Sequence, residues 1–358
     1  MSNLKSKRSV LFFVKSAVGG AERMTLTFAK QLNKDIFNVC VCIIEIPNNN
    51  NIRDFISGHF KVTSLKAFSG ESVIKTMFSL AKIIREENPD IVFSSLFEIN
   101  IRLLLLSPFF LGIRFVIRNN NYLAITSVKQ RWAMRFTYPW ASCLIAQTQE
   151  MKDELIQDLK ISPSKIVVIH NPVDVETIDQ KLSNYESFMN KEKVNYVAVG
   201  RFTHQKGQDI LVKAFWQVCK SEPNSELYVV GRYDENDEFF KDVINWTVEH
   251  GVADKIHLVG FTDNPYIYMK NANCLVLPSR MEGLPNVLIE SLYIGTPVAA
   301  CKCIPVIERI VENGTTGYLT NTDNPEGLAS AMIRAKNLGR VKSSYKSSTI
   351  EDVLVLFN

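Results

Sequence analysis

Several features of common protein classes are missing from this sequence. The longest apolar run, Leu103–Ile113, is interrupted by a serine, a proline and a glycine and is too short to span a bilayer. The apolar stretch Val10–Val14 ends at Lys15 and is shorter than the apolar part of a signal peptide. We therefore expect neither a membrane-spanning helix nor an export signal, and a cytoplasmic protein.

The cysteine and histidine patterns of zinc sites are also missing. The chain has seven cysteines without a CxxC pair and only five histidines. An odd cysteine count without an export signal favours reduced thiols, which we expect in the core. Cys40/Cys42 and Cys301/Cys303 have the spacing of neighbours on one face of a strand.

The charge balance excludes a typical nucleic-acid-binding protein. The 41 lysines and arginines exceed the 37 acidic residues by only four, whereas nucleic-acid binding calls for a dense basic patch. This weak excess suits an anionic small substrate or transient contact with an anionic membrane. At 358 residues, with 46% hydrophobic residues, the chain has the size of two globular domains.

Short apolar runs alternate with amphipathic ones, which is typical of parallel sheets with crossover helices. We expect strands at 9–15, 38–44, 91–95, 115–118, 143–146 and 166–169, with helices at 21–33 and 74–87. After a polar stretch at 179–193 come strands at 196–199, 226–230, 256–258, 274–277 and 297–300, and helices at 210–219, 239–250 and 285–294.

This alternation predicts an α/β protein of two doubly wound Rossmann-like domains that face each other across a cleft. The expected domains are residues 1–175 and 176–340, and a terminal helix within 341–358 is expected to pack back toward the first domain. Ligands of such sheets bind at the carboxyl ends of the strands. The cleft is therefore the expected site.

The densest motif is the segment Pro278–Glu290, which follows an apolar strand and begins a helix. A helix N-terminus, with Pro285 expected as its first residue, suits a diphosphate, and Gly283 allows close backbone approach. Glu282 and Glu290 could accept hydrogen bonds from hydroxyl groups at two ends of one ligand. For each glutamate alone, ordinary helix chemistry is the favoured explanation.

Two further loops follow strands. In the segment Val199–Gly207, Arg201 and Lys206 could neutralise charge on a departing phosphate, although an ordinary cationic turn explains the same residues equally well. In the first half, Gly19 and Gly20 could lie against phosphates, but this pair is not a full GxGxxG fingerprint.

Together these motifs resemble glycosyltransferase family 4 of the GT-B fold, of the bacterial surface-polysaccharide type. The resemblance runs along nearly the whole chain: GGAE at 19–22, NPVD at 171–174, GR…KG at 200–207, EGxPxxxxE at 282–290 and GTPV at 295–298. It is closer in the second half, where the family binds its donor.

The resemblance implies a role for each matching residue. Arg201 and Lys206 would bind the donor diphosphate, Glu282 the hydroxyl groups of the donor sugar and Glu290 those of the ribose. The residues whose backbone would hold phosphate and sugar are Gly283, Leu284, Pro285, Asn286 and Val287. Gly231, Gly260 and Phe261 would line the nucleobase pocket, and Gly19 and Gly20 would face the diphosphate from the acceptor domain. Of these, Arg201, Lys206 and Glu282 would be catalytic.

The resemblance also implies the reaction. The family retains anomeric configuration and uses no metal, and the segment Asp234–Asp237 lacks DxD spacing, so no cofactor is expected. The implied donor is a nucleotide sugar with UDP, and the implied acceptor a saccharide or a polyprenyl-diphosphate-linked glycan at the inner membrane. A sugar-nucleotide epimerase and a non-catalytic binding subunit are the alternatives.

Three segments stay open. Cys301–Ile310 departs from the family's glycine pair, which leaves the role of Glu308 undefined. Arg118–Tyr122 could contact the acceptor or be turn chemistry. The basic-edged stretch Arg102–Arg118, with Arg131, Trp132 and Arg135 after it, could lie on a membrane, but a buried helix and strand explain its apolar part equally well.

Overall fold

The computed structural model describes residues 7–16, 19–45, 52, 56, 60–66, 73–183, 186–345, 348, 352 and 356–357. The chain divides into two compact units. The N-terminal unit comprises Met1–Pro172 with Ser348–Asn358, and the C-terminal unit comprises Val173–Ser347. The division falls inside the NPVD motif at 171–174.

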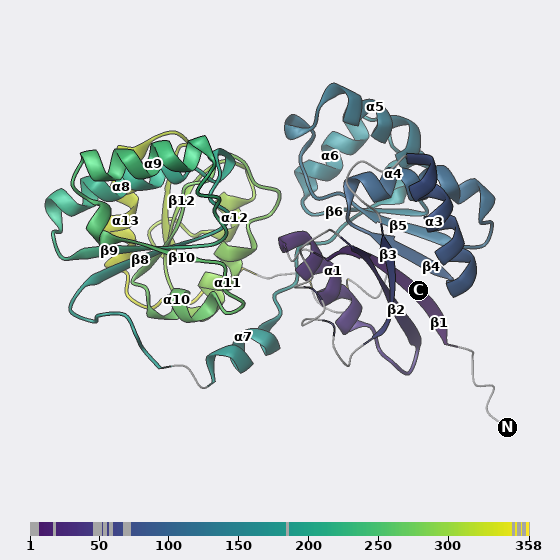
Figure 1. Cartoon of the computed structure of the whole chain (residues 1–358), viewed down its shortest axis with the longest axis horizontal. Helices are drawn as coiled ribbons and strands as arrows, with labels where there is room; N and C mark the ends of the chain where they lie inside the picture. Colours follow the sequence, from purple (N-terminus) through teal and green to yellow (C-terminus); the bar gives the residue numbers. More distant parts are fainter. Residues whose placement is uncertain are drawn as a thin grey trace. The chain divides into compact units, whose positions relative to one another are not determined.

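The N-terminal unit is built on a parallel sheet in the order β3-β2-β1-β4-β5-β6-β7. Its strands are β1 (Arg8–Lys15), β2 (Phe37–Glu45), β3 (Lys61–Lys66), β4 (Ile91–Ser94), β5 (Arg114–Arg118), β6 (Cys143–Ala146) and β7 (Ile166–Val168). Its helices include α1 (Gly20–Gln31), α3 (Val73–Glu87), α4 (Phe97–Leu106), α5 (Val128–Thr137) and α6 (Gln149–Gln157). Figure 1 shows α1 on one face of this sheet and α3, α4 and α5 on the other.

The C-terminal unit repeats this design with the order β10-β9-β8-β11-β12-β13. The strands are β8 (Val194–Val199), β9 (Ser225–Val230), β10 (Ile256–Gly260), β11 (Cys274–Leu277), β12 (Val298–Cys301) and β13 (Gly317–Thr320). The helices are α7 (Val175–Leu182), α8 (Gln208–Ser221), α9 (Glu238–Glu249), α10 (Tyr266–Asn271), α11 (Asn286–Ile294), α12 (Ile307–Ile310) and α13 (Pro325–Lys336). Helices α8, α9 and α13 cover one face, and α10 and α11 the other (Figure 1).

The central strands are short apolar runs because helices cover them on both faces. All four residues of β6, β11 and β12 are buried. Local signals set the helix starts: the Asp237 side chain accepts the Phe239 N–H ahead of α9, and Asn324 accepts the Gly327 N–H ahead of α13. The prediction of two doubly wound α/β units is thus confirmed, whereas a cleft between them stays a prediction.

Other expectations need correction or fall outside the described residues. The apolar part of Arg102–Arg118 forms α4 and β5, and its core residues, such as Leu103 and Phe115, are buried. Residues 341–345 form no helix, and most of 346–358 lies outside the described residues. Phe357, however, is fully buried and packs against Phe12 of β1 at 5.9 Å between ring centroids.

Candidate active site

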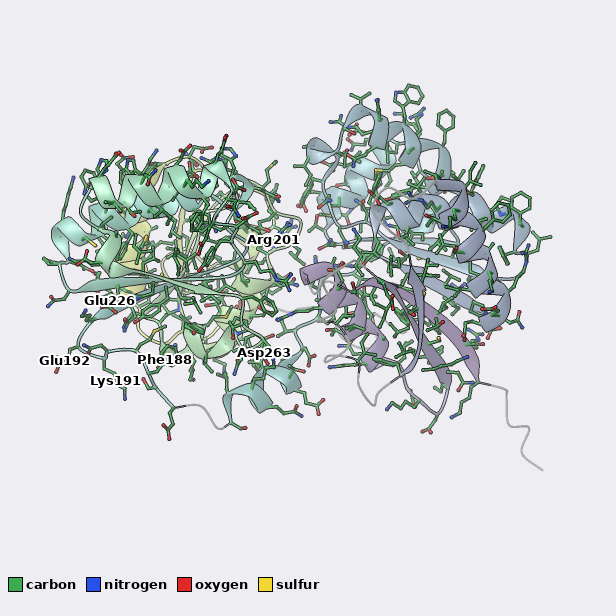
Figure 2. The ribbon with its side chains drawn as sticks, viewed as in Figure 1. Phe188, Lys191, Glu192, Arg201, Glu226 and Asp263 are labelled. Carbon is green, nitrogen blue, oxygen red and sulfur yellow. The ribbon has the colours of Figure 1, made fainter. Side chains whose placement is uncertain are left out.

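The expected site residues of the C-terminal unit follow the carboxyl ends of its strands. Residues 200–207 follow β8, Gly231 follows β9, Gly260 ends β10, and residues 278–285 connect β11 to α11. Parallel strands bring these segments to one edge of the sheet, where α/β proteins bind ligands. Figure 2 shows Arg201 at this edge and Glu226, near the start of β9, at the opposite one.

Lys206 and Glu282 form an ion pair at this edge. The Lys206 ammonium donates to both carboxylate oxygens of Glu282, at 2.7 Å and 2.9 Å. The Glu282 side chain is only 8% exposed and also accepts a 2.6 Å hydrogen bond from the Ser279 hydroxyl. A nearly buried carboxylate is therefore held by a cation from the β8 loop, a contact that the sequence did not reveal.

Two glycines let these loops approach each other. Gly207 has φ +70°, and a Cβ there would lie 2.2 Å from the Pro278 carbonyl oxygen. Gly231 has φ +151°, and a Cβ there would lie 1.9 Å from the Gly200 carbonyl oxygen. Only glycine meets both requirements. The Gly231 N–H also donates to the Gly260 carbonyl at 2.9 Å, so the ends of β8, β9 and β10 are fixed against one another.

Arg280 connects the loops that carry Lys206 and Glu282, although its sequence context predicts no role for it. Its guanidinium makes two hydrogen bonds to the Asp209 carboxylate, at 2.8 Å and 2.7 Å. It also donates to the His204 carbonyl at 2.8 Å. The Arg280 N–H donates to the Gln205 carbonyl at 2.9 Å. Position beside the motif was the only available signal, because the partners lie more than 70 residues earlier.

Asp209, at the start of α8, is ionised by this arrangement. Burial alone raises the pKa of Asp209, but hydrogen bonds and charge attraction from Arg280 outweigh burial, so the pKa lies below its ordinary value. The hydrogen bond to Asp209 in turn raises the pKa of Arg280. Asp323 completes the arrangement at 2.7 Å from Arg280 Nε, but its side chain is 59% exposed.

The remaining positions expected to touch the donor line the same edge. Arg201 is exposed, and no contact of its side chain is found within the described residues. Phe261 is 42% exposed and stacks under the Arg232 guanidinium, which lies 4.6 Å from the ring centroid. An exposed ring next to a cation at the end of β10 could pack against a flat heterocycle.

Helix α11 begins one residue later than expected. Pro285 is the N-cap of α11 and Asn286 the first helical residue, so Pro285 is not the first helical position. Gly283 and Leu284 lie in the loop before the helix, Val287 is the second helical residue, and Glu290 is half-buried in the second turn. The positive end of this nine-residue helix thus lies at the same edge as Lys206.

The cysteines do not supply a nucleophile. Burial raises the pKa of Cys303 to about 12, and the Glu282 carboxylate adds to this increase. Five of the seven cysteines are buried, which confirms the expected core placement for them, whereas Cys219 and Cys303 are half-buried. Cys303 lies beyond β12, however, and does not share a strand with Cys301 as its spacing suggested.

The N-terminal unit holds the remaining predicted positions. Gly19 is the extended N-cap of α1 and Gly20 its first residue, so neither has left-handed backbone. A Cβ on Gly19 would lie 2.7 Å from a Glu22 carboxylate oxygen, whereas Gly20 has open space. These two glycines and the donor-side residues belong to separate compact units.

The Arg118–Tyr122 segment makes contacts within itself and with a distant loop. Arg118 is 2% exposed, burial lowers its pKa, and its guanidinium donates to the side chains of Asn120 and Asn171. The Asn119 amide donates to the Asn121 carbonyl at 2.8 Å. Near β12, the exposed Glu308 carboxylate lies 3.4 Å from the Lys302 ammonium.

Two structural features are missing from the described residues. No group of three or more His, Cys, Asp or Glu side chains suited to a metal ion occurs among them. None of their helices has the length and apolar character needed to cross a membrane.

The fold and these loops define a GT-B protein, and comparisons with known proteins identify its family. The family model "Glycosyltransferase Family 4" matches residues 18–177, and the family model "Glycosyl transferases group 1" matches residues 179–349. Together they span nearly the whole chain, and the chain belongs to glycosyltransferase family 4. The predicted family and fold are thereby confirmed.

The individual relatives share less than a third of their residues with this chain over the matched segments. An uncharacterised glycosyltransferase of Methanocaldococcus jannaschii is 30% identical over 64% of this chain and 60% of its own length. The N-acetylgalactosamine-N,N'-diacetylbacillosaminyl-diphospho-undecaprenol 4-alpha-N-acetylgalactosaminyltransferase of Campylobacter jejuni is 26% identical over 64% of this chain and 59% of its own. The chain thus matches about 60% of the length of these relatives. Anabaena HepE, solved with UDP and glucose, has the same fold, with a TM-score of 0.76 and 19% identity over 92% of both chains.

Proposed function

We propose that the protein is a retaining, metal-independent glycosyltransferase that moves a sugar from a UDP-sugar to a saccharide acceptor in bacterial surface-polysaccharide assembly. The observation that supports it best is the Lys206–Glu282 pair beside the exposed Arg201 and the N-terminus of α11. Arg201 and the helix N-terminus supply positive charge at one edge of a parallel sheet, and Glu282 holds the Lys206 ammonium beside them, which suits the binding of a diphosphate.

In this proposal each part of the donor has its own residues at this edge. Arg201, Lys206 and the α11 N-terminus, with Gly283 to Val287, hold the diphosphate, and Glu282 accepts hydrogen bonds from the donor sugar. Glu290 binds the ribose, and Gly231, Gly260 and Phe261 surround the base. The complex of HepE with UDP supports UDP as the nucleotide. The C. jejuni relative is named as an N-acetylgalactosaminyltransferase acting on a diphospho-undecaprenol-linked acceptor, which supports a lipid-diphosphate-linked acceptor and an N-acetylhexosamine as the transferred sugar.

The proposed chemistry is displacement on one face of the sugar. The bond between the anomeric carbon and the diphosphate breaks, and its electron pair stays on UDP. The acceptor oxygen forms the new bond to the same face, and its proton goes to a donor phosphate oxygen. Arg201 and Lys206 stabilise the negative charge that develops on UDP, a contribution that typically reaches about 10²–10³-fold in rate for one donor group.

Donor binding is the direct test. Thermal unfolding is measured with UDP-, GDP- and ADP-sugars at equal concentration, and we expect UDP-sugars to raise the Tm most, because ligands that bind only the native state stabilise it. Glu290→Ala should lose this shift. A larger shift with GDP- or ADP-sugars would overturn the nucleotide assignment.

Product analysis tests the reaction itself. NMR of the product should show the anomeric configuration of the donor, and EDTA should leave the rate unchanged. An inverted product or strict dependence on Mg²⁺ or Mn²⁺ would contradict the mechanism. Release of UDP with an altered free sugar in the absence of acceptor would identify an epimerase instead.

A further inference from the structure

Arg232, two residues after β9, presents an arginine side chain at the donor edge of the C-terminal unit. The residue is half-buried, and its carbonyl accepts the Phe202 N–H at 2.9 Å, which fixes its backbone to the loop after β8. Within the part of the chain that the structure describes, the guanidinium forms no hydrogen bond and no ion pair, and the contact found for it is the Phe261 ring, 4.6 Å away. Five N–H donors are therefore available to a ligand at this edge.

The acidic residues that follow Arg232 have other partners. The Asp234 carboxylate accepts the Asn236 N–H at 2.9 Å, and the Asp237 carboxylate accepts the Phe239 N–H at 2.8 Å ahead of α9. Neither forms an ion pair with Arg232 among the described residues. The positive charge of Arg232 is thus not used by its own loop.

The strand order separates Arg232 from the groups assigned to the diphosphate. The order is β10-β9-β8-β11, so Arg201 and Lys206 follow β8 and the α11 N-terminus follows β11. Arg232 lies one strand further out, at about 4.8 Å per strand, and Phe261 follows the edge strand β10. A nucleoside diphosphate whose phosphates bind beside β8 and β11 therefore directs its nucleoside toward Arg232 and Phe261.

The chemistry of the guanidinium suits one kind of base. Phe261 covers one face of the Arg232 guanidinium, and the N–H groups lie in the guanidinium plane, so they remain directed outward around its rim. An arginine donates hydrogen bonds and accepts none. Uracil offers carbonyl oxygens as acceptors, whereas adenine has no carbonyl group and presents an amino donor on its edge.

We propose that Arg232 is a specificity-determining residue that donates hydrogen bonds to a carbonyl oxygen of the donor base and so favours uracil over adenine. Phe261 holds the guanidinium in place and packs beside the base. The inference rests on the proposed function, because it requires a nucleoside diphosphate bound at this edge.

Nucleotide affinities test the inference. Dissociation constants for UDP, ADP and inorganic pyrophosphate are measured by calorimetric titration of the unmodified chain and of Arg232→Met. We expect the substitution to weaken UDP binding at least about tenfold and to change ADP binding little, so the preference for UDP over ADP falls by the same factor. Comparing this preference between the two proteins removes the difference in size between the bases. Pyrophosphate affinity should not change.

Arg334→Met is the matched control. The Arg334 guanidinium also lies over an aromatic ring of the C-terminal unit, 3.9 Å from the centroid of Tyr318. Tyr318 belongs to β13, however, at the other end of the sheet from β10. This variant should bind all three ligands like the unmodified chain. Unchanged melting temperatures show that both variants are folded.

Two results would overturn the role of Arg232 alone. One is an unchanged preference for UDP over ADP in Arg232→Met. The other is an equal loss of affinity for UDP, ADP and pyrophosphate, which would assign Arg232 to the diphosphate. A failure of the proposed function has a different signature: the unmodified chain would bind none of the nucleotides, before any substitution is made.

Discussion

The Lys206 ammonium lies 2.7 Å and 2.9 Å from the two carboxylate oxygens of Glu282, although 76 residues separate them. Lysine and glutamate therefore form one unit, in which each side chain fixes the position from which the other would contact the donor. Their side chains are 22% and 8% exposed, so water compensates little if one partner is lost. Substituting either residue should affect stability as well as transfer.

Lys206→Ala should leave the Glu282 carboxylate without its cation. We expect the free energy of unfolding to fall by about 3 kcal/mol and the transfer rate by at least about 10²-fold. The double variant Lys206→Met/Glu282→Gln should lose about 1–3 kcal/mol less than the summed losses of Lys206→Met and Glu282→Gln. Urea unfolding of the unmodified chain, these two single variants and the double variant measures this coupling. Strictly additive losses would show that the pair does not stabilise the loops.

Arg280 should act by positioning Lys206 and Glu282 rather than by touching substrate. Arg280→Lys keeps the charge but loses the planar fork that fits the Asp209 carboxylate. We expect kcat to fall by about 10²-fold, because small displacements of catalytic groups have large effects. The KM for the donor should change little. Steady-state kinetics separates the two constants.

Asp323→Asn is the matched control for Arg280. It removes the charge of a 59% exposed partner, and asparagine tolerates the positive φ of 54° at this position. Exposed pairs contribute at most about 1 kcal/mol, so kcat should stay close to that of the unmodified chain. An equal loss of kcat in both variants would mean that the charge network as a whole matters, and not the fork on Asp209.

Much of the fold could be predicted because it is local in sequence. β6 and β11 have the predicted bounds, since each is a four-residue apolar run buried on both faces. β3 was missed because Lys61–Lys66 has no apolar alternation, and α7 because it overlaps the polar stretch at 179–193 that separates the two halves. Such elements owe their structure to their neighbours rather than to their own pattern.

The candidate site was predictable as a set of loops but not as a geometry. Sequence order placed Arg201, Lys206 and Glu282 after strand ends, where the fold brings them together. It could not show that Lys206 pairs with Glu282 or that Arg280 reaches Asp209, because these contacts depend on which strands are neighbours. For Arg102–Arg118 the sequence left a membrane surface and a buried helix and strand open, and the burial of Leu103 supports the second for its apolar part, since apolar character alone does not separate a core helix from an exposed one.

Gly231 should tolerate no side chain. Gly231→Ala would place a Cβ 1.9 Å from the Gly200 carbonyl oxygen at φ +151°, and we expect a loss of unfolding free energy of about 3 kcal/mol or more. Gly251→Ala is the control, because Gly251 has φ +64° but a Cβ added there would meet no atom within 4 Å, so it should lose only about 1 kcal/mol. Similar losses in both variants would assign the effect to backbone conformation alone. Thermal unfolding of both variants makes the comparison.

Thiol reagents should not inactivate the enzyme at neutral pH. Burial raises the pKa of every cysteine, to about 11 for Cys219 and about 12 for Cys40, Cys301 and Cys303. The thiolate is the reactive form, and a raised pKa keeps the thiol protonated up to strongly alkaline pH.

Iodoacetamide at pH 7 should therefore leave transfer unchanged over many turnovers, and mass spectrometry should find no modified cysteine in the folded protein. In urea, where burial is lost, all seven cysteines should react. Rapid alkylation of Cys303 in the folded state, with loss of transfer, would show that the β12–α12 loop opens beside Glu282. That outcome would give the loop a role in admitting the donor sugar that its closed geometry does not suggest.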